Sequence, residues 1–108
     1  MNMAYDIERK EVVAALGRAR SLIMMDGWIQ GQSGGSDCGW CLAGACVSAA
    51  RDGRLAEDAM ILLSYQMPPE YTRHCIGVTA LVKWNDEPER TKADVISMLD
   101  KALAKQGA

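Results

Sequence analysis

Residues 27–46 read GWIQGQSGGSDCGWCLAGAC, and the interpretation of this stretch decides the fold. It contains six glycines, three cysteines and two tryptophans. Its first part, QGQSGGS at residues 30–36, is typical of a loop. In its second part, small and apolar residues recur at helical spacing, which predicts a helix after an N-cap at Asp37. The buried stripe of this helix would contain Cys38, Cys41, Leu42, Ala45, Cys46 and Ala49.

Helical spacing continues on both sides of this stretch. We expect Asp6 to cap the first helix, Gly27 to end it, and Gly53 to end the second. Thr91 and Asp94 form a capping box that predicts the start of the last helix. Gly44 would allow a neighbouring backbone to approach the second helix. The other predicted helices cover residues 6–25, 55–66 and 70–84.

These segments predict an all-α fold, a compact single-domain bundle of about four to five helices over residues 1–108. Residues 76–84 also alternate between apolar and polar positions, so a strand remains an alternative there. Pro69 favours the helix, because proline suits a first helical turn.

Charge and hydropathy exclude two classes of partner. Twelve Lys and Arg residues oppose fourteen Asp and Glu residues, which gives a net charge of −2 without a basic stripe. This balance argues against binding to nucleic acid. The N-terminal residues are polar, and no apolar run reaches the length of a membrane span. We therefore expect a cytoplasmic protein with no membrane partner.

The cysteines allow a zinc site or a thiol enzyme as alternatives. Cys38 and Cys41 have zinc-knuckle spacing, but the adjacent His74 and Cys75 would point in different directions on a helix. A catalytic cysteine needs a base, and His74 is the only histidine. Packing on a helix face explains the cysteines more simply. We expect no catalytic residue, no metal and no cofactor.

Polar and aromatic residues gather at two predicted chain turns, one after the first helix and one before the last. Trp and Arg offer flat faces on which a ligand can stack, and Asn, Gln and Asp can form hydrogen bonds with its polar edge. This mixture suits a planar, polar ligand such as a nucleotide, with Arg90 neutralising a phosphate. The predicted ligand-binding residues are Trp28, Gln30, Trp84, Asn85, Asp86, Arg90 and Thr91.

A structural interpretation of the same residues stays open. Asn85 and Asp86 would then form a turn, and Asp86 would pair with Arg90 beside the capping box. Trp28 and Trp84 would fill the core instead of facing a ligand.

Three motifs resemble a small family of unknown function that occurs in bacteria, notably actinobacteria, and in phages. They are GWxQG at residues 27–31, CLxGA at residues 41–45, and WND followed by RT at residues 84–91. The resemblance covers about residues 8–104. It implies a small helical protein but no activity, and it implies no four-cysteine pattern, so Cys38, Cys46 and Cys75 are peculiar to this chain. The phage occurrence implies a role against host defence.

We therefore expect a non-enzymatic binding protein that captures a small polar or nucleotide-like ligand. The phage occurrence of the similar family leads us to expect a phage-encoded protein directed against host defence. The alternative is a protein–protein inhibitor or adaptor that binds a host protein or forms a homodimer. Exposed methionines among Met24, Met25, Met60 and Met67 would favour this alternative.

Overall fold

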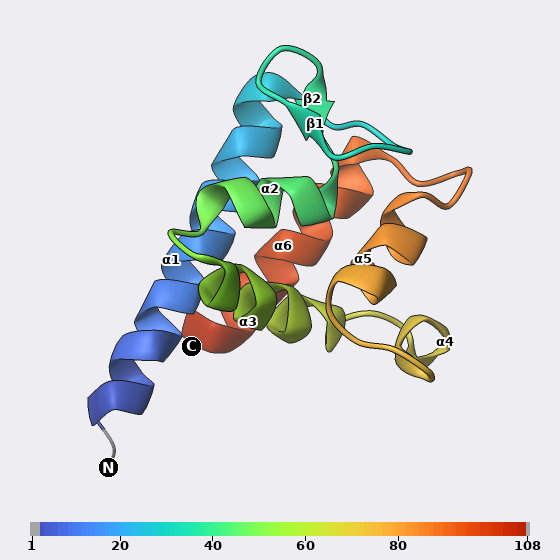
Figure 1. Ribbon diagram of the computed structural model, residues 1–108. Helices are drawn as coiled ribbons and strands as arrows, with labels where there is room; N and C mark the ends of the chain where they lie inside the picture. Colours follow the sequence, from blue (N-terminus) through green and yellow to red (C-terminus); the bar gives the residue numbers. More distant parts are fainter. Residues whose placement is uncertain (1–2, 108) are drawn as a thin grey trace.

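A computed structural model describes residues 3–107, and the side-chain environments of residues 9–105. This part of the chain contains six helices and one short antiparallel hairpin (Figure 1). The mainly helical fold predicted from the sequence is therefore confirmed. The elements are α1 (Met3–Asp26), β1 (Gly34–Gly35), β2 (Gly39–Trp40), α2 (Leu42–Ala49), α3 (Gly53–Ser64), α4 (Pro69–Thr72), α5 (Val78–Asn85) and α6 (Lys92–Gly107).

The long helix α1 forms one side of the molecule and runs from the N-terminus to the hairpin (Figure 1). It packs against α2, α3 and α6, and the fully buried Leu16 and Ile23 belong to its core face. Arg20 Nε lies 2.6 Å from Asp100 Oδ1, which ties α1 to α6. Asp6 lies inside α1, so its predicted role as N-cap is wrong. Gly27 ends the helix as expected, with a φ of +100°.

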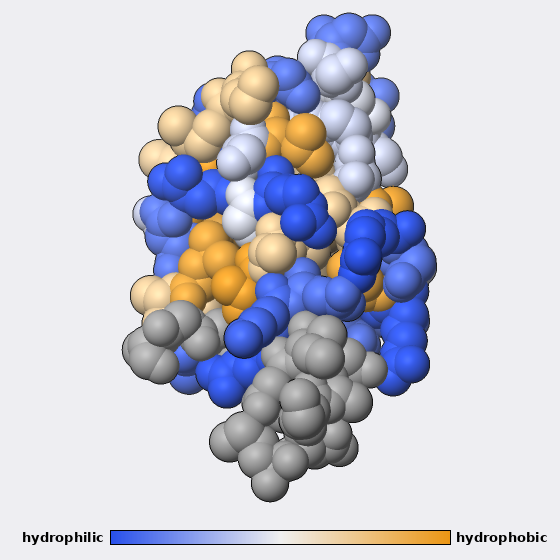
Figure 2. Space-filling view, turned by 90° about the vertical axis from the view of Figure 1, so that its left-hand side faces the viewer, coloured by the Kyte–Doolittle hydropathy of each residue, from blue (hydrophilic) through white to orange (hydrophobic). Residues whose placement is uncertain are grey.

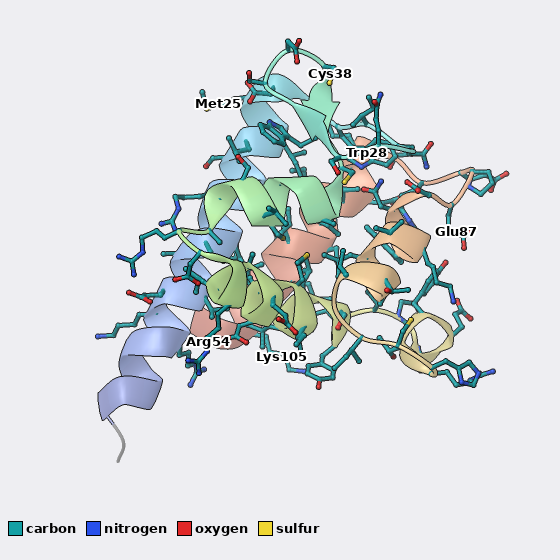
Figure 3. All side chains as sticks on the ribbon, in the orientation of Figure 1. Met25, Trp28, Cys38, Arg54, Glu87 and Lys105 are labelled. Atoms are coloured by element: carbon teal, nitrogen blue, oxygen red, sulfur yellow. The ribbon has the colours of Figure 1, made fainter. Side chains whose placement is uncertain are left out.

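The second helix begins later than predicted. Residues 38–41 are not part of α2. A turn and β2 come before this helix, and Cys41 is its N-cap. The Cys41 thiol accepts a hydrogen bond from Gly44 N at 3.1 Å. Cys38 is exposed in the turn of the hairpin and does not belong to the buried stripe (Figure 3). The interpretation of Asp37 as the cap is therefore wrong.

The expected close approach at Gly44 is confirmed. A Cβ atom there would lie 2.2 Å from the carbonyl oxygen of Ser33. Cys41 N donates to the same oxygen at 3.2 Å, so the loop before the hairpin presses directly on the first turn of α2.

Gly53 does not end the second helix; it is the first residue of α3. Asp52 caps α3 by accepting a hydrogen bond from Leu55 N at 2.8 Å.

The predicted helix at residues 70–84 is divided into α4 and α5, because Gly77 has a φ of +71°. Residues 78–85 are helical, which settles the choice between helix and strand.

The capping box at the start of α6 is confirmed in both directions. Thr91 N donates to Asp94 Oδ2 at 3.0 Å, and Asp94 N donates to Thr91 Oγ1 at 3.1 Å. These two bonds satisfy backbone donors that the first turn of a helix leaves open.

Candidate functional site

The side chain of Asn85 joins three segments of the chain and is almost fully buried, with 1% of its surface exposed. Its Oδ1 accepts from Trp28 Nε1 at 2.7 Å and from Leu42 N at 3.0 Å. Its Nδ2 donates to Ile29 O at 3.2 Å and to Asp86 Oδ1 at 3.0 Å. Asn85 therefore holds the loop after α1 and the start of α2 against the end of α5.

Gln30 and Asp86 add a second layer of contacts at the same junction. Gln30 Nε2 donates to Asn85 O at 3.0 Å and to Glu87 O at 2.6 Å. Gly31 N donates to Asp86 Oδ1 at 3.0 Å. The GWxQG and WND motifs thus contact each other directly, although more than fifty residues separate them.

Arg90 lies with Trp84 in a separate cluster. The guanidinium carbon of Arg90 lies 3.9 Å from the centroid of the buried Trp84 ring, and Arg90 Nε donates to Trp84 O at 2.9 Å. Arg90 Nη2 donates to the Tyr71 hydroxyl at 3.2 Å, and that hydroxyl donates to Glu87 Oε1 at 3.1 Å. Partial burial and the Glu87 carboxylate raise the pKa of Tyr71, while Arg90 acts in the opposite direction.

The predicted site residues consequently occupy three places. Trp28, Gln30, Asn85 and Asp86 meet at one junction, Trp84 and Arg90 stack beside it, and Thr91 caps α6. The predicted pair of Asp86 and Arg90 is wrong, because Asp86 accepts from Gly31 and Asn85 instead. The structural interpretation holds for Trp84, which is buried. Ligand binding by these residues stays a prediction.

A cleft of ≈ 490 Å³ opens between α2, α5 and the loop before the hairpin. Asn85 and Asp86, at the end of α5, line it together with apolar side chains of both helices. Asp86 is the only charged residue among the described residues that line the cleft. The lining consists of Gly31, Gln32, Ser33, Trp40, Cys41, Ala43, Gly44, Val47, Ser48, Val78, Val82, Asn85 and Asp86.

Three valines of this cleft were not predicted as site residues. Val47, Val78 and Val82 are 56%, 49% and 42% exposed. Val78 and Val82 share helical spacing with Tyr71 and Cys75, but Ala80 and Leu81 belong to the buried face of α5. Periodicity alone could not distinguish the two faces, because both carry apolar residues.

A family model described as "Family of unknown function (DUF6197)" matches residues 8–105. The chain belongs to this family. No curated protein and no solved structure matches the chain. Membership in DUF6197 confirms the resemblance to a small family of unknown function, but it assigns no ligand to the cleft.

The thiols of this DUF6197 protein lie in different environments. Cys38 is exposed on the hairpin, and Cys41 and Cys46 are buried at the start of α2 and within it. Burial raises the pKa of Cys46 to about 12, with a smaller contribution from Cys41. Among the described residues, no group of three or more His, Cys, Asp or Glu side chains could hold a metal ion.

Cys38 and His74 do not form a catalytic pair in this DUF6197 protein. Cys38 lies in the turn of the hairpin, whereas His74 follows α4, and the hairpin and α4 lie well apart (Figure 1). Within residues 3–107, no helix combines the length and the apolar character that crossing a bilayer requires.

Proposed function

We propose that this protein is a non-enzymatic binding protein that captures a small molecule in the cleft between α2 and α5. The observation that carries this proposal is the cleft itself. Its volume of ≈ 490 Å³ lies within the range of about 300–1,000 Å³ typical of small-molecule sites. Apolar walls with a few polar groups are also typical of such sites.

The contacts around Asn85 support the proposal, because they keep one end of the cleft in a fixed arrangement. Leu42 N and Ile29 O are held by the Asn85 side chain, and Gly31 N is held by Asp86. A site that is already ordered loses less conformational entropy when a ligand binds. Trp28 and Gln30 thus act as positioning residues in this proposal, and Asn85 and Asp86 line the cleft.

The biological use that we propose is anti-defence. The family that the sequence resembles occurs in phages, and a phage protein that captures a small immune signal in the cytoplasm would protect the infection. A nucleotide-like signal would need a cation near its phosphates. Arg90, the residue expected to supply this cation, lines a separate open pocket with Tyr71 and Glu87. The described lining of the cleft itself contains no such cation.

Native mass spectrometry tests the proposal. The purified protein is mixed with a small-molecule extract of the producing cells, and an added mass of a few hundred daltons is expected. Val82→Trp would fill the cleft and abolish the added mass. Lys83→Trp, at an exposed neighbouring position outside the lining, would retain it. Equal ligand loads in both variants would refute a site in this cleft.

A second candidate is a protein–protein inhibitor or a homodimer, and exposed methionines favour it. Met24 is 49% and Met25 is 82% exposed at the end of α1, where Met25 points away from the protein (Figure 3). Met60 and Met67 are buried and give no such support. Hydrophilic residues interrupt the apolar ones on the α1 side of the surface (Figure 2).

Sedimentation and pull-down experiments test this second candidate. Met25→Glu should abolish a protein contact through the end of α1, because burying a new charge is costly. Ala14→Glu adds the same charge at another exposed position of α1 and is the matched control. A monomer without a captured partner in the unsubstituted protein would argue against the candidate.

A further inference from the structure

We propose that the ligand of the cleft is a small apolar amine, bound as the ammonium ion by the carboxylate of Asp86. This inference rests on the proposed function, because it assigns a ligand class to the same cleft. It differs from the nucleotide-like ligand expected from the sequence, and charge complementarity within the cleft carries it.

The Asp86 carboxylate uses only one of its two oxygens in hydrogen bonds with the described residues. Oδ1 accepts hydrogen bonds from Gly31 N and Asn85 Nδ2, both at 3.0 Å, and these bonds fix the orientation of the carboxylate. Among the described residues, no donor contacts Oδ2. Asp86 is exposed and lines the cleft, so its carboxylate offers an acceptor to which an ammonium group can donate.

The Asp86 carboxylate gives the lining of the cleft a net negative charge. No Lys or Arg is among the described residues that line it, so the Asp86 charge is not neutralised there. Lys83 lies on α5 but outside the lining. A phosphate or carboxylate ligand would therefore meet a like charge without a compensating cation, whereas an ammonium ion meets an opposite charge.

The start of α2 does not reverse this preference. The amide of Leu42 is bonded to Asn85 Oδ1, and the amide of Gly44 is bonded to the Cys41 thiol. Two donors that could hold an anion at this helix terminus are thus already used. The positive end of the short helix faces a junction that already contains the Asp86 carboxylate.

The walls of the cleft suit a ligand with an apolar body. Val47, Val78 and Val82 supply exposed apolar surface on two facing helices. Trp40 adds a half-buried indole, whose Nε1 is already bonded to Asp26 Oδ2 at 2.8 Å. The indole can therefore contribute its apolar ring and its π face, which attracts cations. These walls favour an aliphatic or aromatic body next to the ammonium group.

Three probes of matched shape test the inference: 4-phenylbutylamine, 4-phenylbutanol and 4-phenylbutanoate. Their affinities are measured by titration of the ¹⁵N-labelled protein, with the amide signals of Gly31, Val47 and Val82 as reporters of the cleft. We expect the amine to bind about fivefold more tightly than the alcohol, a factor consistent with a partly solvated ion pair. The carboxylate should bind most weakly. Added salt should weaken binding of the amine and leave the alcohol unchanged.

Asp86→Asn removes the charge and keeps an oxygen that can accept from Gly31 N. This variant should bind the amine no more tightly than the alcohol, so the ratio of the two affinities is the quantity to compare. Glu87→Gln neutralises the next carboxylate, which lies outside the cleft, and should leave the preference intact. If Asp86→Asn does not fold, the order of the three probes and its salt dependence still decide the question in the unsubstituted protein.

The outcomes separate this inference from the proposed function. Binding of the three probes in the cleft with equal affinity, or tightest binding of the carboxylate, would overturn the amine and leave a small-molecule site. The absence of signal changes at the cleft with every probe would overturn the amine and weaken the proposed function as well. Changes confined to residues around Arg90 would move the site to the pocket of Tyr71 and Glu87.

Discussion

The side chain of Asn85 holds the loop after α1 in place through hydrogen bonds. It makes four hydrogen bonds with groups from the loop, from α2 and from its own neighbour Asp86. An amide is suited to this place because it offers donors and acceptors together. The residue that the sequence suggested as a ligand contact therefore has a structural role, whether or not it also contacts a ligand.

Asn85→Leu should lower the free energy of unfolding by about 3 kcal/mol, because it leaves the buried Leu42 N and the half-buried Trp28 side chain without their acceptor. Urea denaturation followed by circular dichroism measures this loss. Gln32→Leu makes the same type of change at an exposed position and should alter stability by no more than about 0.5 kcal/mol. Similar losses in both variants would contradict the role assigned to Asn85.

At the scale of elements, the contact between α2 and the preceding loop positions the cleft. Gly44 brings the first turn of α2 against the backbone of Ser33, and both residues line the cleft. Gly17 lies in the middle of α1 and has nothing within 4 Å of the position a Cβ would take. Packing therefore explains the glycine at position 44, whereas nothing packs against the one at position 17.

Gly44→Ala should destabilise the protein by about 1–3 kcal/mol, because the new methyl group collides with backbone atoms that have little freedom to move. Gly17→Ala should stabilise it by up to about 1 kcal/mol, because alanine favours the helical state. Thermal unfolding of both variants measures the two effects. A stabilising effect of Gly44→Ala would mean that Ser33 does not press on α2.

At the scale of the whole molecule, the ionisation of the buried Cys46 thiol is coupled to unfolding. It is 1% exposed, and burial raises its pKa from 9.0 to about 12. The folded state therefore favours the protonated thiol more than the unfolded state does. This contribution to stability is fully present below pH 9.0 and is lost as the pH rises toward about 12.

We predict that the free energy of unfolding falls between about pH 8 and about pH 10.5 by more in the unsubstituted protein than in Cys46→Ala. Alanine removes the titrating group, although it also leaves a small cavity that lowers stability at both pH values. The quantity to compare is thus the change with pH, not stability itself. Parallel pH dependences would show that Cys46 does not titrate with unfolding.

The sequence by itself determined the helical class and the ends of the most regular helices. Gly27 ends α1, Thr91 and Asp94 cap α6, and Gly44 permits a close approach. Each of these features depends on neighbours in sequence or on the absence of a side chain, so local patterns suffice. We predicted that the WND and GWxQG motifs share a ligand site, but we did not predict that they contact each other directly.

Only the tertiary structure decided the conformation of residues 38–41 and the location of the cleft. The sequence favours a helix there, but the backbone of Trp40 instead bonds to Gly27 O and Ile29 N. Asn85, more than forty residues away, binds Leu42 N where the helix then begins. The exposed faces of Val78 and Val82 likewise depend on which side of α5 the core covers. Such choices depend on partners distant in sequence, and helical periodicity contains no information about them.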